Sequence, residues 1–111
     1  MYTYAATTIR CIDGDTAVFE VDLGFYLKYR SSFRLLAVDA PEVVGAEKAD
    51  GLRWKAKLEE LMPVGSVVII HTTKADKYGR WLASVETLDG VSINHALVEA
   101  MTTGASTEEV Q

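Results

Sequence analysis

Three short segments of this sequence carry residue types that could perform metal or phosphate chemistry. The first is Asp13-Gly14-Asp15-Thr16, which lies between two stretches of strand-like sequence. An Asp-Gly pair is a common hairpin turn, so a purely structural turn is one interpretation. Two carboxylates two residues apart can also both reach one hard cation. The segment alone leaves both interpretations open.

The second segment runs from Phe33 to Glu42 and contains an arginine within an apolar stretch. A buried or half-buried arginine needs a carboxylate or a phosphate as partner. At the end of this stretch, Pro41 forces a turn where Asp39 and Glu42 leave the strand. A structural salt bridge from Arg34 to one of these acids is therefore an alternative to a phosphate site.

The third segment is Asp76-Lys77-Tyr78-Gly79-Arg80-Trp81. It could be a charged hairpin turn, or it could place a second guanidinium at the mouth of a barrel. Zinc is not indicated, because His71 and His95 lie apart without ligand spacing. The single cysteine, Cys11, lies in a strand-like stretch and is expected to be a buried, inert thiol.

The elements that must position these residues follow from the apolar patterning. We expect strands at about residues 3–12, 15–23, 26–38, 67–73 and 80–87. We expect helices at about residues 47–62 and 93–101, the first ended by Pro63 and the second capped by Ser92. Three strands, a helix, two strands and a helix predict an α+β chain built on a five-stranded OB-fold barrel.

Together the segments resemble the staphylococcal nuclease (thermonuclease) family. The resemblance rests on four motifs in the family's order and near its spacing: the Asp13–Thr16 turn, the Phe33–Glu42 strand end, the Asp76–Arg80 hairpin and the helix sequence Asn94-His95-Ala96-Leu97-Val98. It covers about residues 7–101. The resemblance implies an SNase-like OB-fold.

The resemblance also implies a Ca²⁺ site. Asp15 and Asp39 would bind the ion through their carboxylates, and Ala40, which replaces the family's usual threonine, would bind it through its backbone carbonyl. Asp13 would stand near the ion in its outer shell. Such a set of oxygen ligands is what Ca²⁺ prefers.

The remaining implied roles concern the substrate. Arg34 and Arg80 would clamp the scissile phosphate, and Glu42 would be the general base for the attacking water or would orient that water. Lys77 and Tyr78 would touch the substrate's terminal phosphate. A cation and two arginines are suited to stabilise the charge on the phosphoryl oxygens as water attacks.

Three features depart from the family pattern. The loop between Glu42 and the following helix is short, which could hold Glu42 more firmly. The segment from Gly24 to Ser32 is longer and contains Phe25-Tyr26-Leu27-Lys28-Tyr29-Arg30. It could be an extended hairpin, or a substrate-contacting arm, since mixed aromatic and basic residues suit single strands. The chain also ends soon after the Asn94 helix and lacks the family's usual long C-terminal helix. Because core surface could then be uncovered, we expect self-association as a homodimer.

Two functions compete at this point. The first is a metal-dependent endonuclease of low sequence specificity that acts on DNA, with single strands preferred and RNA left open as a second substrate. The presence of Asp15, Arg34, Asp39, Glu42 and Arg80 favours this hydrolase. The second is a non-catalytic OB-fold module that binds nucleic acid or a protein partner. The net charge of −5 favours the module, because phosphate binding normally needs a positive surface.

Length and composition limit the remaining possibilities. The 111 residues predict one domain over residues 1–104, followed by a short polar tail over residues 105–111. No apolar run approaches the ~20 residues that span a bilayer, so no membrane partner is expected. The N-terminal residues lack the basic start and apolar stretch of a signal peptide, and we therefore expect a cytoplasmic protein.

Overall fold

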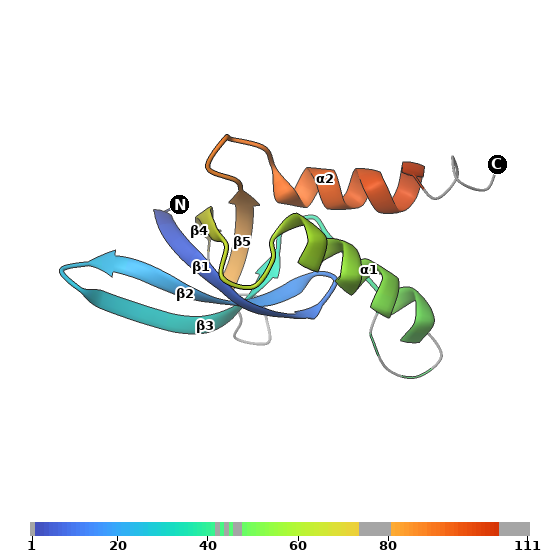
Figure 1. Cartoon of the computed structure of the whole chain (residues 1–111), viewed down its shortest axis with the longest axis horizontal. Helices are drawn as coiled ribbons and strands as arrows, with labels where there is room; N and C mark the ends of the chain where they lie inside the picture. The colour runs from blue at the N-terminus through green and yellow to red at the C-terminus, as the bar shows by residue number, and fades with distance from the viewer. Residues whose placement is uncertain (1, 42, 44, 46–47, 74–80, 105–111) are drawn as a thin grey trace.

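The computed structural model describes residues 2–41, 43, 45, 48–73 and 81–104, and its strands form a closed barrel (Figure 1). The barrel order is β1-β2-β3-β5-β4, in which β3 and β5 pair in parallel and the other neighbours pair antiparallel. The strands are β1 (Tyr2–Asp13), β2 (Thr16–Gly24), β3 (Leu27–Leu35), β4 (Val67–Thr73) and β5 (Trp81–Glu86). The predicted five-stranded barrel is confirmed.

Two helices pack against this barrel. Helix α1 (Lys48–Leu61) contacts β1, and helix α2 (Ile93–Glu99) contacts both β5 and α1. Ser92 caps α2 by accepting a hydrogen bond from the backbone N–H of His95, and a π-helical segment, Ala100–Gly104, follows. Within the described part of the chain, no helix is long and apolar enough to span a membrane.

The core lies inside the barrel and beneath the helices. Successive residues of a strand point to opposite faces, so every second residue of β2 is directed inward. The rings of Phe19 and Phe33 meet edge to face at 5.7 Å between centroids. Leu58 lies in α1, Met62 directly follows α1, and Leu97 lies in α2. The two helices therefore contribute large apolar side chains to the same core as the strands.

The third strand ends earlier than the sequence predicts. We expected it to continue to Val38, but β3 ends at Leu35 and the chain turns over the next two residues. The cause is Ala37, which has a positive φ of 63° that is incompatible with an extended strand. Val38 is nevertheless buried, so its apolar character reflects the core rather than the strand.

The segment from Gly24 to Ser32 forms the extended hairpin that was one of its two interpretations. Strands β2 and β3 remain paired from Thr16 and Arg34 out to Gly24 and Leu27. The hairpin projects well beyond the rest of the barrel (Figure 1). Whether this arm contacts substrate stays a prediction.

Candidate active site

The turn between β1 and β2 is held against α1 by a glycine. A Cβ atom on Gly14 would lie 2.5 Å from Cβ of Trp54 and 2.9 Å from Cβ of Ala40. Real Cβ atoms do not approach other atoms so closely, so only glycine allows this packing. The turn therefore brings Asp15 next to the segment that follows β3.

Asp15 is a buried carboxylate with fixed hydrogen-bond partners. Its residue is 6 % exposed, its Oδ1 accepts from the Thr16 hydroxyl at 3.0 Å, and its Oδ2 accepts from the Ala40 N–H at 3.1 Å. The Asp15 carbonyl also accepts from the backbone N–H of Leu35 at 2.8 Å. A buried carboxylate needs such partners, and here they fix its orientation.

Arg34 lies between two carboxylates. Its Nη2 is 3.6 Å from Oδ2 of Asp15 and 3.5 Å from Oδ1 of Asp39, and it donates to the Val38 carbonyl at 3.4 Å. The Asp39 side chain is 97 % exposed, whereas the Asp15 side chain is buried. The salt bridge from Arg34 to Asp39, which was one interpretation of the sequence, is therefore present. Arg34 also contacts Asp15, which the sequence did not indicate. These three residues form the charged cluster of the site.

Asn94 connects α2 to this cluster, a role that motif resemblance did not reveal. Its Nδ2 donates to the carbonyls of Leu36 at 2.8 Å and Ala83 at 3.2 Å, and its Oδ1 accepts from the Val85 N–H at 2.8 Å. Leu36 begins the turn that leads to Asp39. Asparagine at the inward face of a helix start was the available signal, because a buried amide must find several backbone partners.

The structure therefore brings together five of the residues chosen from the sequence. Asp13 ends β1, is half-buried and lies opposite Thr16, so it stays near Asp15. Arg34, Asp39 and Ala40 come to the same place from β3 and the turn after it. The other four residues, Glu42, Lys77, Tyr78 and Arg80, lie outside the described residues.

The donor chemistry of the cluster fits a hard cation in part. Asp15 and Asp39 already share one positive group, the Arg34 guanidinium. Ca²⁺ takes 6–8 oxygen ligands, so two carboxylates need further carbonyl or water oxygens. Over the described ranges, no group of three or more histidine, cysteine or acidic side chains is placed to hold a metal. Among the described residues, Asp15 and Asp39 thus provide two of the carboxylates that a Ca²⁺ site would need.

Comparison with known proteins agrees with the fold. Residues 32–107 match the sequence model of the family described as staphylococcal nuclease homologue. The chain is 33 % identical over 92 residues to a protein of Escherichia coli O157:H7 named "Uncharacterized endonuclease", and equally to one of the same name from Escherichia coli. Each match covers 83 % of this chain and 54 % of the relative, so the chain spans about half the length of these relatives. The chain belongs to the staphylococcal nuclease homologue family.

Proposed function

We propose that this chain is a Ca²⁺-dependent nuclease domain that hydrolyses phosphodiester bonds of DNA, and also of RNA, with low sequence specificity. The observation that carries the proposal is the cluster of Asp15, Arg34 and Asp39 at the end of β3. Membership of the staphylococcal nuclease homologue family supports it, as do relatives that are named endonucleases.

In this proposal the cation is held by the carboxylates of Asp15 and Asp39 and by the backbone carbonyl of Ala40, with Asp13 close by. Asp15 is oriented beforehand, since Thr16 and Ala40 both donate to it. The exposed Asp39 carboxylate is the one that can move to meet an ion or substrate. When bound, Ca²⁺ would supply positive charge to the phosphoryl oxygens.

Arg34 would bind the scissile phosphate. Its guanidinium is always charged and offers a planar fork of donors. Its distances of 3.5 and 3.6 Å to the two carboxylates are long for ion-paired hydrogen bonds, so those contacts are weak and leave donor capacity for a phosphate. We assign Glu42 as the base that takes a proton from water, Arg80 as a second clamp, and Lys77 and Tyr78 as contacts to a terminal phosphate.

The test is cleavage of plasmid DNA and of single-stranded oligonucleotides, with Ca²⁺ and with excess chelator. We expect cleavage to stop in chelator, and Asp15→Asn to weaken Ca²⁺ binding measured by calorimetry on the folded protein. Asp89→Asn makes the same chemical change in an exposed turn and should leave both readouts unchanged. Undiminished cleavage in chelator would contradict metal dependence.

A non-catalytic nucleic-acid or protein-binding module is the second candidate, and two observations favour it. The net charge is −5, and Arg34, the described cation of the site, is shared by two carboxylates. A binding module would bind a partner without cleaving it. Folded protein that binds oligonucleotide but leaves it intact with every divalent cation tested would therefore establish the module.

A further inference from the structure

The outer end of the β2–β3 hairpin has one face on which charges are matched in pairs. We call residues 20–30 the arm. Arg30 pairs with Glu20 at 3.0 Å, and Lys28 pairs with Asp22 at 3.7 Å, both between opposite strands. These cross-strand pairs leave the arm without excess positive charge. A polyanion such as a nucleic-acid strand needs unpaired cations for its phosphates, so this face does not attract one.

The other face of the arm is apolar and uncovered. Leu23, Leu27 and Tyr29 are all exposed. They follow the alternation of the buried Val21 and Phe33, so they extend the inward face of the barrel beyond the point where the barrel ends. No described part of the chain packs over these side chains enough to bury them. A continuous apolar strip of this kind marks an interaction surface.

The tip of the arm displays two aromatic rings at an energetic cost. Phe25 is 93 % exposed and Tyr26 is fully exposed, and both have positive φ, 56° and 65°. A two-residue hairpin turn with both central φ angles positive favours Asn-Gly, because most residues with a Cβ atom are strained in this region. Folding alone would not select a Phe-Tyr pair here. The rings are therefore better explained by an intermolecular contact.

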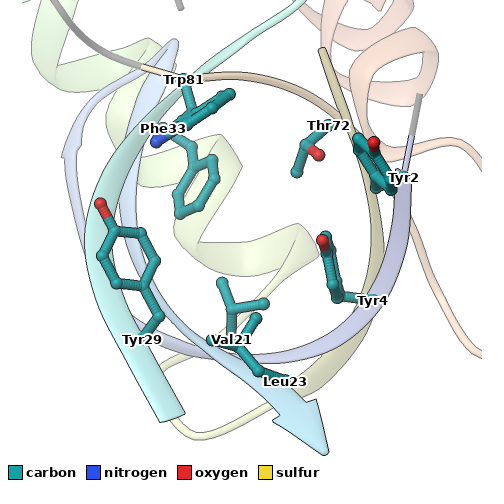
Figure 2. A pocket seen from close by; sticks show the side chains of 8 residues that line it. All are labelled: Tyr2, Tyr4, Val21, Leu23, Tyr29, Phe33, Thr72 and Trp81. Atoms are coloured by element: carbon teal, nitrogen blue, oxygen red, sulfur yellow. The ribbon is translucent and has the colours of Figure 1, made fainter. Parts of the chain in front are cut away.

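The same molecule contains a pocket suited to such rings. Figure 2 shows a pocket within the ring of strands, surrounded mostly by aromatic and apolar side chains. Its volume is about 230 Å³. The lining residues are Tyr2, Tyr4, Val21, Leu23, Tyr29, Phe33, Thr72 and Trp81. None of these side chains is charged, and five are aromatic. Offset or edge-to-face contacts could therefore hold an incoming aromatic ring.

We propose that two copies of this chain associate through their arms, so that the tip of each arm inserts Phe25 and Tyr26 into the pocket of the other. Each molecule offers one tip and one pocket, which is the self-complementarity that a two-fold interface requires. Leu23, which lines the pocket, and Leu27 lie on the arm next to the tip, and would meet their counterparts near the two-fold axis. Because the contact area is limited to one face of the arm, the dimer is weak and concentration-dependent.

The test is the replacement of both tip residues, Phe25→Asn with Tyr26→Gly. The new pair suits the turn, so thermal stability should be kept or raised, while the aromatic tip is lost. We expect sedimentation velocity to show a concentration-dependent dimer for the parent chain and a monomer for the variant. A parent chain that stays monomeric at millimolar concentration, or a variant that dimerises equally well, would overturn the proposal.

A second variant tests the pocket side. Tyr29→Glu places a charge at the exposed edge of the pocket and should also give a monomer. The tip variant keeps an intact pocket and the Tyr29→Glu variant keeps an intact tip. A mixture of the two can therefore form one of the two contacts, and it should dimerise where neither variant does alone. A mixture that remains monomeric would contradict the tip-in-pocket contact.

The effect of added salt distinguishes a dimer interface from a nucleic-acid-binding surface. With a net charge of −5, two copies repel each other, and salt screens that repulsion. Added salt should therefore strengthen the dimer, whereas it weakens contacts to phosphate. If the tip variant instead left self-association unchanged and weakened oligonucleotide binding, the arm would be a nucleic-acid contact and the dimer proposal would be wrong.

Discussion

At the residue scale, Gly14 controls how closely Asp15, Ala40 and α1 can approach one another. We expect Gly14→Ala to destabilise the fold by about 1–3 kcal/mol, the usual cost of forcing extra volume into a packed site. Cleavage by the folded fraction should also fall, because the Asp15 carboxylate moves away from the Ala40 N–H. The measurements are a urea midpoint and the cleavage rate.

Gly90→Ala is the matched control for Gly14→Ala. Gly90 has a φ of 89° in a distant turn, and an added Cβ would meet nothing within 4 Å. This change should lower stability through backbone strain while leaving cleavage per folded molecule intact. If both variants lost cleavage in proportion to stability, Gly14 would have no separate role in placing the carboxylate.

Cys11 gives a second prediction at this scale, based on its burial. Burial raises the pKa of the thiol from 9.0 to about 11, because the thiolate is poorly solvated in the core. The unfolded chain then ionises this group first, so its contribution to stability is complete below pH 9 and is lost between pH 9 and about 11. We expect Cys11→Ala to reduce the fall of the urea midpoint over that interval. An identical slope in both proteins would show that the thiol is not protected.

At the element scale, strand alternation and helix-ending residues were enough to predict the barrel and both helices. The chemistry of the turns was harder to predict. Ala37 adopts a positive φ, although alanine does not signal such a conformation, and the third strand was therefore predicted to be too long. The same turn determines where Asp39 and Ala40 meet Asp15. Sequence motifs selected these residues, but they could not show that Arg34 contacts both carboxylates.

Asn94 is the clearest case of an element positioned by one side chain. It donates to two carbonyls and accepts one N–H, so it connects α2, β5 and the turn after β3. We expect Asn94→Asp to lower stability by about 1–3 kcal/mol at neutral pH, because two carbonyls lose their donor and face a carboxylate instead. Chemical denaturation measures this effect.

The adjacent residue provides the control for Asn94→Asp. The His95 side chain is exposed and its contact with Glu99 is long at 3.9 Å, so His95→Ala should leave the urea midpoint nearly unchanged. Equal losses in the two variants would mean that the position in α2, rather than the amide network, determines the effect.

At the scale of the whole molecule, the chain is acidic, and the described charges of both the arm and the candidate site are paired. The net charge is −5, the arm carries matched ion pairs, and the site places Arg34 between two acids. An acidic protein of this kind can bind nucleic acid only through a small number of local contacts. A cation bound by Asp15 and Asp39 would reduce the negative charge at the place where phosphate must approach. Few phosphate contacts are therefore expected in any complex.

The salt dependence of nucleic-acid binding tests this arrangement. If Arg34, Lys77 and Arg80 each contact one phosphate, the logarithm of the affinity for a single strand should fall with the logarithm of salt at a slope of about −2. Fluorescence anisotropy with a labelled oligonucleotide measures the slope. The measurement uses the Glu42→Gln variant, which prevents cleavage while keeping every Lys and Arg side chain.

Arg34→Ala in this background should make the slope shallower by about 0.7, because one phosphate contact is lost. Lys57→Ala should leave the slope unchanged, because Lys57 lies on α1 and its ammonium already pairs with Glu60 at 2.6 Å. An affinity that does not depend on salt would remove phosphate as the recognised group, and a protein partner would then be the better assignment for this barrel.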